Sequence, residues 1–409
     1  MKCRHCAAHL SFPFLDLGSA PPSNAYLSEA ALREPEVWYP LRLLVCMQCW
    51  LVQTEDHAGR EALFTDEYAY FSSYSSSWLE HAQRYVHAMR ERFELDAGSF
   101  VVEVAANDGY LLQYVQQAGI PCLGIEPTAS TAAAARAKGI PVVERFFGVE
   151  LATELASKGQ RADLIAANNV LAHVPDINDF VQGFARLLKD DGVATFEFPH
   201  LLRMVREHQF DTAYHEHYSY LSLGAVTRIF RSNGLDVFDV EEHPTHGGSL
   251  RVFAQRSDIS GRAQQPRVAE LLRTEADAGM LAPDFYAGFQ AVADQVRCDF
   301  LAFLLQARAK HQSVAAYGAA AKGNTLMNYA GVRPDLISFV VDRNPAKQGK
   351  YMPGSRIAIV AEDRLSQARP DYVVILPWNL EAELIKQLGY IRSWGGRFVT
   401  AVPKLRCTP

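Results

Sequence analysis

One short stretch, from Val101 to Gly109, places the strongest constraint on the fold of this chain. Its first part is apolar and rich in β-branched residues, which is typical of a buried parallel strand. Small and polar residues at 106–109 break the run, and apolar residues then recur at helical spacing over 110–115. Strand, tight turn and helix form the opening of a nucleotide-binding βαβ unit, in which backbone N–H groups approach a ligand. The sequence therefore predicts an α/β fold.

The next predicted strand, 121–125, ends in Glu126, where a carboxylate can accept both hydroxyls of a ribose. A dinucleotide fingerprint would place glycines where this chain has Ala105 and Asn107. Their loss disfavours a pyrophosphate, and hence NAD, whereas S-adenosylmethionine carries no phosphate. We expect its ribose at Glu126 and its amino-acid part near Gly109. On this stretch alone, an ordinary α/β turn without a ligand is the alternative.

Composition limits the class of protein. A chain of 409 residues indicates two or three domains, and 49% hydrophobic with 21% charged residues is typical of a soluble globular protein. A net charge of −6 argues against a general nucleic-acid or membrane-surface binder. No apolar run approaches the ~20 residues of a membrane span, and Met1 leads into no signal-type segment. We therefore expect a cytoplasmic protein without nucleic-acid or membrane partners.

Four of the seven cysteines form two close pairs, Cys3-x-x-Cys6 and Cys46-x-x-Cys49. Two such knuckles supply four thiolates, which close a tetrahedral zinc site and leave no open position for catalysis. Zinc would replace a hydrophobic core that residues 1–58, which are strand- and loop-like, are too short to build. The alternative is a set of four unligated core thiols. The sequence predicts a structural zinc module.

Residues 59–95 are predicted to be helical, with a break at an aromatic and hydroxyl-rich cluster that includes Tyr70, Ser72 and Ser73. This cluster lines a pocket at a domain junction or packs as a hinge. Residues 96–255 form the predicted α/β domain, whose third strand, 141–147, ends in Phe146 and Phe147. These two rings pack on a purine or belong to the core.

The fourth predicted strand, 162–169, ends in Asn168 and Asn169 and leads to His173. Ligands of open α/β sheets bind beyond the carboxyl ends of the strands, so these three side chains are expected to face one. A helix ending near 189–192 precedes a fifth strand, 193–199. The domain closes with a glycine corner after His246 and a strand.

The segment 211–222 contains Tyr214, His215, Glu216 and His217 without an apolar stripe. Such a cluster favours acid–base chemistry, because a core would have to satisfy every one of these polar groups. A purely structural role is the first alternative. A metal site is the second, although the spacing is not H-E-x-x-H.

Residues 262–311 are predicted to be a largely helical connector with breaks at Pro266 and Pro283. A second α/β unit follows over 312–409, with strands at 313–317, 336–341, 372–376 and 397–402. Its first turn carries Lys322, which suits a phosphate, and the polar, basic loop 342–354 suits an anionic ligand. The alternative is an α/β domain that binds nothing.

Together these residues resemble the three-domain, zinc-containing, S-adenosylmethionine-dependent C-methyltransferases that act on nucleotide-linked keto-deoxysugars. The resemblance covers nearly the whole chain and rests on the cysteine knuckles and on the segments 70–73, 103–109, 169–173, 214–217, 246–251, 317–324, 342–354 and 376–379. One departure is Ala358, where the family often has proline.

The resemblance implies a zinc module over 1–58, a class I methyltransferase Rossmann-like domain over 59–257 and a second Rossmann-like α/β domain over 258–409. It implies that the middle domain binds S-adenosylmethionine, with contacts assigned to Glu103, Ala105, Asn107, Gly109, Glu126, Pro127, Phe146, Phe147, Asn168, Tyr70 and Ser72. The sugar nucleotide, usually a thymidine diphosphate sugar, is assigned to Tyr70, Ser73, His246, Lys322, Asn324, Arg343, Lys347 and Tyr351. We expect a monomer or weak dimer.

The implied base is His217, with Tyr214, Glu216, Asn169 and His173 around the substrate. Methylation of carbon needs a carbanion equivalent, and a hydrogen beside a ketone, here at C-3 of a 4-keto sugar, is acidic enough for an enzymic base. Glu216 would orient the base or contribute to it, and Tyr214 would donate a hydrogen bond to the enolate oxygen. His215 is the competing base.

Three other functions remain open from the residues alone. A zinc-ribbon RNA methyltransferase shares two modules, but its expected basic face conflicts with the acidic net charge. An NAD-linked oxidoreductase would use the second α/β unit with Gly318, Gly323 and Asp342. The third is a sugar-nucleotide binder without catalysis.

Overall fold

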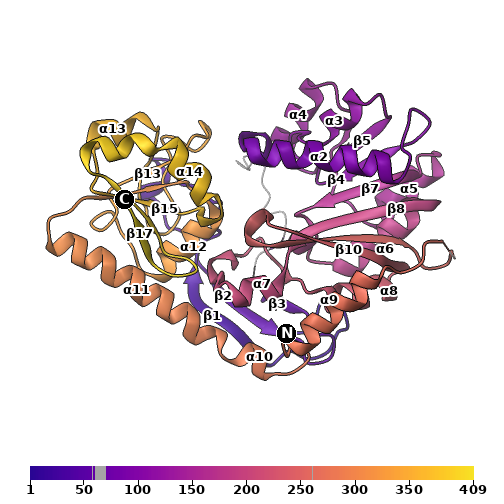
Figure 1. Cartoon of the computed structure of the whole chain (residues 1–409), viewed down its shortest axis with the longest axis horizontal. Coiled ribbons are helices and arrows are strands. Elements are labelled where there is room, and N and C mark those ends of the chain that lie inside the picture. Colours follow the sequence, from indigo (N-terminus) through magenta and orange to yellow (C-terminus); the bar gives the residue numbers. More distant parts are fainter. Residues whose placement is uncertain (58, 60–70, 260) are drawn as a thin grey trace.

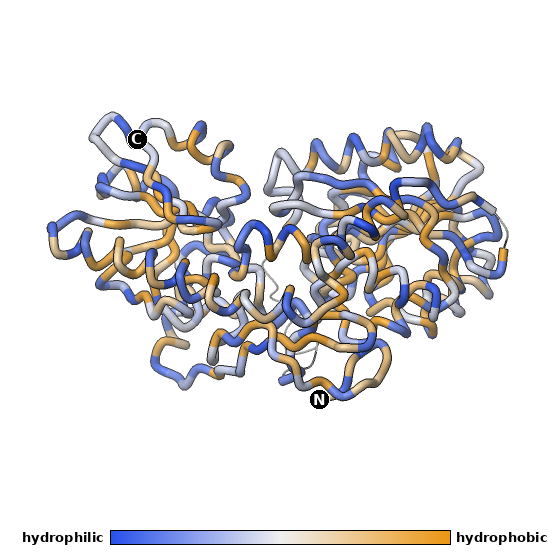
Figure 2. Tube along the Cα trace, turned by 60° about the horizontal axis from the view of Figure 1, so that its bottom comes forward, coloured by the Kyte–Doolittle hydropathy of each residue, from blue (hydrophilic) through white to orange (hydrophobic). Residues whose placement is uncertain are grey.

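The computed structural model describes residues 1–57, 59, 71–259 and 261–409. Two α/β lobes stand above a smaller N-terminal sheet and are joined along the lower edge of the molecule by a long helix, α11 (Phe289–Ala309) (Figure 1). In the tube view, hydrophobic residues gather along the inner strands of each lobe (Figure 2). The predicted α/β fold with an N-terminal zinc module is confirmed. Tyr70 lies outside the described residues.

The N-terminal sheet is antiparallel and contains one strand from the middle of the chain. Its order is β1 (Phe12–Ala20), β2 (Tyr39–Val45), β3 (Val52–Thr54) and β9 (Ser219–Tyr220). The ring of Phe14 on β1 stacks on Phe289 of α11 with 4.7 Å between centroids. This small sheet therefore contacts both the middle lobe and the connector of the C-terminal lobe.

The middle lobe is a doubly wound sheet with the strand order β10-β11-β8-β7-β4-β5-β6 in the described part of the chain. The strands are β4 (Val101–Val104), β5 (Cys122–Ile125), β6 (Val142–Val143), β7 (Ala162–Asn168), β8 (Leu188–Pro199), β10 (Leu235–His243) and β11 (Ser249–Arg256). Strands β4 to β8 are parallel, and β11 runs antiparallel to both β8 and β10. The parallel strands explain the continuous apolar runs in the sequence.

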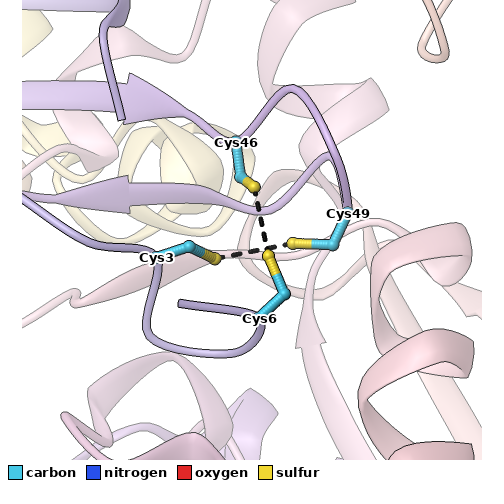
Figure 3. A group of neighbouring side chains, drawn as sticks. All are labelled: Cys3, Cys6, Cys46 and Cys49. Carbon is cyan, nitrogen blue, oxygen red and sulfur yellow. Dashed lines mark hydrogen bonds between the residues drawn. The ribbon is translucent and has the colours of Figure 1, made fainter. Parts of the chain in front are cut away.

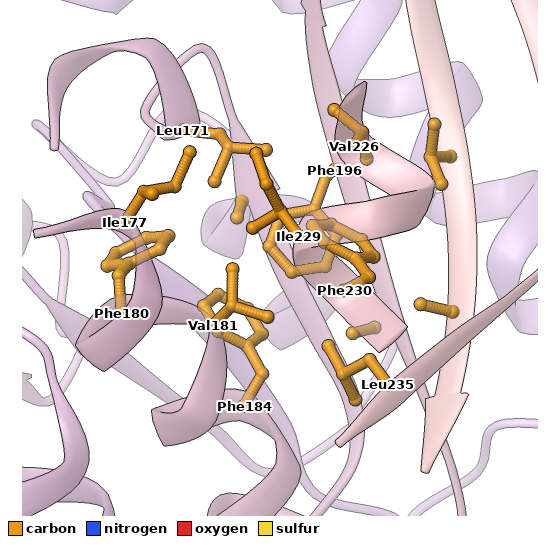
Figure 4. Close-up of a cluster of buried hydrophobic side chains, with 14 of the residues drawn as sticks. Leu171, Ile177, Phe180, Val181, Phe184, Phe196, Val226, Ile229, Phe230 and Leu235 are labelled. Carbon is orange, nitrogen blue, oxygen red and sulfur yellow. The ribbon is translucent and has the colours of Figure 1, made fainter. Parts of the chain in front are cut away.

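Helices cover both faces of this sheet. They are α2 (Ser76–Arg92), α3 (Leu112–Gln117), α4 (Ala129–Ala137), α5 (Val149–Ser157), α6 (Ile177–Leu187) and α8 (Leu223–Ser232), whereas α7 (Leu201–Arg206) packs with the N-terminal sheet. Figure 4 shows α6 and α8 pressing their apolar faces onto β8, where the ring of Phe196 lies 4.5 Å from Phe184 and 4.6 Å from Phe230. The i, i+3, i+4, i+7 spacing along α6 produces this buried face.

The C-terminal lobe is a second doubly wound sheet, with the order β14-β13-β12-β15-β16-β17. Its strands are β12 (Val314–Tyr317), β13 (Val340–Val341), β14 (Ile359–Val360), β15 (Tyr372–Ile375), β16 (Arg397–Thr400) and the antiparallel β17 (Arg406–Thr408). In chain order this is the 3-2-1-4-5-6 arrangement of dinucleotide-binding folds. Its helices are α12 (Ala321–Tyr329), α13 (Asp363–Ala368) and α14 (Glu381–Gln387).

Some element boundaries differ from the sequence prediction. The third strand of the middle lobe covers only 142–143 instead of 141–147, and β8 begins at Leu188, before the predicted start at 193. Pro266 begins α9 (Pro266–Asp277) instead of breaking a helix, because the first helical residue does not need its N–H. Pro283 precedes the short α10 (Asp284–Ala287), so it does separate two helices.

Among the described residues, no helix combines the length and the apolar character that a membrane crossing requires.

The packing around Gly109 yields a stability prediction. Its φ of +76° is left-handed, and a Cβ there would overlap Ile140 and lie 3.3 Å from the Cβ of Ala135. Gly119 has a similar φ of +73°, but a Cβ added there would meet nothing within 4 Å, so it is the matched control. We expect Gly109→Ala to cost about 1–3 kcal/mol more unfolding free energy than Gly119→Ala, measured by urea denaturation without ligand. Equal losses would show that the contact with α4 does not constrain this turn.

Candidate active site

A cavity of about 320 Å³ lies between the two α/β lobes. It is lined by residues that lie at or just after the ends of β4 (Ala105 and Asn107), β7 (Asn168 and Asn169) and β12 (Ala320 to Lys322). These are the carboxyl ends of central strands, at the points where the strand order of each sheet reverses, and such points are the usual ligand sites of doubly wound sheets. Both sheets therefore present their binding edges to one cavity.

The turn after β4 adopts a glycine-like geometry without glycine at its first positions. Ala105 has a φ of +59° and Asn107 a φ of +49°, both left-handed. Asparagine tolerates this region, whereas alanine is strained there by about 1 kcal/mol, a cost that folds retain mainly at functional sites. The side-chain Oδ1 of Asn107 accepts a hydrogen bond of 2.9 Å from the backbone N–H of Ser72, which brings the segment after residue 70 to the cavity.

Glu126 lies in the cavity wall at the end of β5. Its Oε2 accepts a hydrogen bond of 3.0 Å from the backbone N–H of Asn107, and its Oε1 accepts one of 3.0 Å from Thr128. Burial raises the pKa of this carboxyl. Pro127, Phe146 and Phe147 line the same end of the cavity, where a purine would follow a ribose held by Glu126. Phe147 also packs on Phe184, so it serves the core as well.

Buried polar atoms behind this turn have no well-aligned hydrogen-bond partner among the described residues. They are both carboxylate oxygens of Glu103 and both amide atoms of Asn168. Asn168 lines the cavity, whereas Glu103 is fully buried behind it, and burial raises the pKa of Glu103 well above its usual range. Only Asn168 is placed to meet a ligand, and its amide oxygen suits an N–H or O–H donor of that ligand. Gly109 does not line the cavity and acts in packing.

The opposite end of the cavity holds His217 and Tyr214. The Nδ1 of His217 donates to the carbonyl oxygen of Thr212 at 2.9 Å, so its Nε2 accepts the hydrogen bond of 2.6 Å from the Tyr214 hydroxyl. Burial lowers the pKa of His217 well below its usual range, which keeps the imidazole neutral and leaves the Nε2 lone pair unprotonated. His173 lies beside it, with 4.6 Å between ring centroids, and burial lowers its pKa to about 4.

Glu216 and His215 point away from this cavity. The Oε1 of Glu216 accepts hydrogen bonds of 3.2 Å from both the backbone and the side-chain N–H of Asn24, and burial raises its pKa. The Nε2 of His215 donates to the carbonyl oxygen of Pro40 at 3.2 Å. Neither residue lines the cavity, but Asn24 does. Sequence reasoning missed Asn24, because nothing in the loop after β1 marks it.

His246 and Asn169 meet between the two ends. The amide Nδ2 of Asn169 donates to the Nε2 of His246 at 2.9 Å, and both residues have left-handed backbones. The backbone N–H of Asn169 donates to the carbonyl oxygen of Glu197 at 2.7 Å. The Glu197 carboxylate is fully buried, and its ion pair with Arg251 and hydrogen bond with His81 hold its pKa down at about 2. This supporting network was not predicted.

Two lysines of the C-terminal lobe line the cavity. The ammonium of Lys322 donates to the Oδ1 of Asn379 at 2.9 Å and lies 4.3 Å from the centre of the Trp378 ring. That of Lys347 donates to the carbonyl oxygen of Ala319 at 2.8 Å and lies over the ring of Tyr26. Burial lowers the pKa of Lys322 to about 8.

The remaining predicted residues lie outside the cavity wall. The Ser73 hydroxyl accepts a hydrogen bond from Lys138, Arg343 bonds to Gln387, and Tyr351 forms a β-bridge with Leu27. Asn324 is fully buried on α12, with neither amide atom paired among the described residues.

The four predicted zinc ligands converge near the N-terminus (Figure 3). The sulfur atoms of Cys3, Cys6, Cys46 and Cys49 all lie within 4.8 Å of one another, and the closest pairs are 3.5 Å apart. Tetrahedral zinc with bonds of about 2.3 Å requires sulfur atoms about 3.8 Å apart, so the set fits. The two knuckles form the same kind of turn. The backbone N–H of Ala7 donates to the carbonyl oxygen of Cys3, and that of Trp50 donates to the carbonyl oxygen of Cys46.

Comparisons with known proteins agree with this architecture. Residues 3–64 match a family described as a zinc binding domain, 78–240 a methyltransferase domain, and 244–403 a C-methyltransferase C-terminal domain. The C-methyltransferase NovU from Streptomyces niveus is 33% identical over 405 residues, which is 99% of this chain and 96% of the relative.

Two solved methyltransferase structures are similar to part of this chain. Magnesium protoporphyrin IX methyltransferase from Synechocystis PCC 6803 with bound SAM is 14% identical and covers 50% of this chain and 100% of its own, with a TM-score of 0.36. A S-adenosylmethionine-dependent methyltransferase from Clostridium acetobutylicum is 9% identical over 44% of this chain and 92% of its own, also with a TM-score of 0.36.

The middle sheet, the four-cysteine cluster and the matching domains define an S-adenosylmethionine-dependent methyltransferase with a zinc module. The full-length relative shows the family: this chain belongs to the three-domain C-methyltransferases. S-adenosylmethionine is its methyl donor, and the four cysteines are its zinc ligands.

The zinc site yields a second prediction. We expect one zinc ion per chain by elemental analysis, and Cys49→Ser should release it and unfold the N-terminal module, because structural zinc contributes on the order of 10 kcal/mol. Cys298→Ser is the control, since Cys298 is exposed and outside the cluster. A chelator-washed protein without zinc that keeps its melting temperature would contradict a structural role.

The cavity wall around Glu126 yields a third prediction. Glu126→Ala should weaken S-adenosylmethionine binding roughly ten- to a hundredfold, because a charged hydrogen bond to the ribose contributes about 1.5–3 kcal/mol. Calorimetric titration measures the affinity. Glu144→Ala is the control, because Glu144 is exposed and pairs with Arg136 at 2.8 Å. Equal affinities in the two variants would show that Glu126 does not bind the ribose.

Proposed function

We propose that this protein transfers the methyl group of S-adenosylmethionine to C-3, the carbon beside the ketone, of a nucleotide-diphosphate-linked 4-keto deoxysugar. A thymidine diphosphate sugar is the expected form. The observation that carries the proposal is the neutral, buried His217, whose basic Nε2 meets the Tyr214 hydroxyl at 2.6 Å in the cavity that also reaches the donor turn.

This site suits methylation of carbon through an enolate. A base removes the hydrogen beside the ketone, the electron pair moves onto the ketone oxygen, and the resulting enolate attacks the sulfonium methyl in line. His217 is neutral near neutral pH because its pKa is depressed by burial, so it is ready to accept a proton. Protonation below that depressed pKa would inactivate the base, so this group makes the rate fall on the acid side.

Tyr214 takes part in the proton path in this arrangement. Its hydroxyl proton points to the Nε2 of His217, since the Nδ1 of that histidine donates to Thr212. The phenol oxygen can therefore accept the substrate proton while its own proton passes to His217. This role differs from the enolate-stabilising one inferred from sequence. His173 and Asn169 would flank the substrate. Glu216 is fixed by Asn24, and its carbonyl oxygen accepts a hydrogen bond of 2.8 Å from the Nδ1 of His173, so it would orient that histidine.

The C-terminal lobe supplies cations for the substrate. Lys322 and Lys347 both line the cavity and offer positive charge to an anionic substrate, with the diphosphate assigned to Lys347. His246 faces the sugar in this proposal. Ser73, Arg343 and Tyr351 would contact the nucleotide only if its outer part extends beyond the cavity wall, whereas Asn324 is fully buried. Tyr70 lies outside the described residues. The C-methyltransferase family removes the oxidoreductase and the non-catalytic binder from consideration.

Hydrogen exchange tests the proposed base without methyl transfer. With S-adenosylhomocysteine in place of the donor and dTDP-4-keto-6-deoxyglucose as the probe, the enzyme in heavy water should exchange the C-3 hydrogen. His217→Asn should lower this exchange roughly 10²–10⁴-fold, the usual contribution of a positioned base.

His215→Asn is the matched control for this experiment. His215 is buried like His217 but turned to Pro40, so its variant should keep the exchange. Exchange that is retained in His217→Asn and lost in His215→Asn would show that His215 is the base. Nuclear magnetic resonance follows the C-3 and C-5 hydrogens separately, which also tests the position.

A further inference from the structure

We propose that Lys322 is a further catalytic residue, whose ammonium stabilises the negative charge on the enolate oxygen, and that Trp378 and Asp211 position it. The inference rests on the proposed function and assigns a specific role to one of its two cavity lysines. It follows from where the ammonium lies, from what holds it and from which charge the reaction creates.

Lys322 is at the first turn of α12, directly after β12, at the point where the C-terminal sheet reverses its strand order. Asn379 is the one hydrogen-bond acceptor that the described residues give its ammonium, at 2.9 Å. A lysine ammonium has three N–H donors. The Trp378 ring face lies 4.3 Å away and attracts the cation, so the group is held in place with donor capacity left for the cavity.

The Trp378 indole links this cation to a buried carboxylate. Its Nε1–H donates to the Oδ2 of Asp211 at 2.8 Å, and Asp211 is fully buried on a short 3-10 helix, η4 (Phe210–Thr212), of the middle lobe. Lys322 and Trp378 belong to the C-terminal lobe. Phe210, next to Asp211, packs in the same hydrophobic cluster as Leu326 of α12, so the ammonium, indole and carboxylate form one unit.

The Trp378 indole also packs closely against Gly247, the residue that follows His246. Gly247 has a φ of +92°, and a Cβ there would lie 2.5 Å from Cη2 and 2.9 Å from Cζ3 of Trp378. The positive charge of Lys322 also contributes to the depressed pKa values of His217 and His246. Lys322 is therefore electrostatically close to the proposed base.

The reaction needs a cation at this place. The C-3–H bond breaks and its proton passes to the Tyr214–His217 pair. The electron pair forms a C-3–C-4 double bond, and the ketone π electrons move to the oxygen. The three cavity histidines here are neutral, and the Tyr214 hydroxyl is engaged with His217. A preorganised ammonium in a buried site stabilises such an oxyanion strongly. The pair then returns to C-3 as the methyl–carbon bond forms and the methyl–sulfur bond breaks.

The experiment separates this role from phosphate binding. Lys322→Met keeps the length of the side chain and removes its charge. We expect C-3 hydrogen exchange of dTDP-4-keto-6-deoxyglucose to fall roughly 10²–10³-fold, while the affinities for dTDP and S-adenosylhomocysteine, measured by calorimetry, stay within about threefold. Lys347→Met is the contrast variant and should weaken dTDP binding. A Lys322→Met variant that loses dTDP affinity as much as exchange, or keeps exchange, overturns the proposal.

A pH profile decides the matter if Lys322→Met fails to fold, which loss of S-adenosylhomocysteine binding would reveal. Asp211, His217 and His246 are the titratable groups whose charges act on or respond to Lys322. Its pKa of about 8 predicts that wild-type exchange declines above that pH as the ammonium loses its proton. Asp211→Asn should move this decline to lower pH, and Lys322→Arg should abolish it. An unchanged alkaline limb in both variants overturns the proposal. Absence of any exchange in the wild type would instead overturn the proposed function.

Discussion

The pairing of β3 with β9 is the interaction on which the site depends most. Strand β9 begins two residues after His217, and β3 follows the second cysteine knuckle closely along the chain. The hydroxyl of Thr54 on β3 donates to the carbonyl oxygen of His217 at 2.6 Å, and the Thr54 backbone N–H donates to Tyr218. Zinc fixes the knuckle, the knuckle fixes β3, and β3 fixes the backbone of the proposed base. A zinc ion on these four thiolates would therefore support the proposed site through the fold of the N-terminal module.

In each doubly wound sheet one carboxylate accepts the same pair of backbone hydrogen bonds, but the two carboxylates serve different purposes. The carboxylate of Glu126 accepts one hydrogen bond from the backbone N–H of Asn107, in the turn after β4, and one from that of Thr128, two residues further along the chain. Asp342 does the same for Ala319 and Asn344 in the C-terminal sheet. Glu126 lines the cavity, whereas Asp342 lies 3.9 Å from Lys347 and does not. The first unit can accept a ribose at this carboxylate, and the second presents lysines instead.

Local patterns in the sequence predicted much of this molecule. The strand–turn–helix at 101–115, the cysteine pairs and the helix before β8 are encoded by residues close together in the chain, so the α/β fold and the zinc ligands could be inferred. The hydrogen bonds from Asn24 to Glu216 and from Trp378 to Asp211 join residues that are far apart in the sequence. No spacing pattern in the sequence indicates such contacts. The role of Tyr214 depended on the tautomer of His217, which only its contact with Thr212 reveals.

The most direct test of the central claim is the bond that the transferred methyl group forms. The enzyme should be incubated with dTDP-4-keto-6-deoxyglucose and S-adenosylmethionine carrying a carbon-13 methyl group, and the product examined by nuclear magnetic resonance. The account predicts a labelled methyl bonded to ring carbon C-3, beside the ketone. A labelled methyl on oxygen, or a sugar nucleotide that stays unlabelled while the donor is consumed, would contradict it.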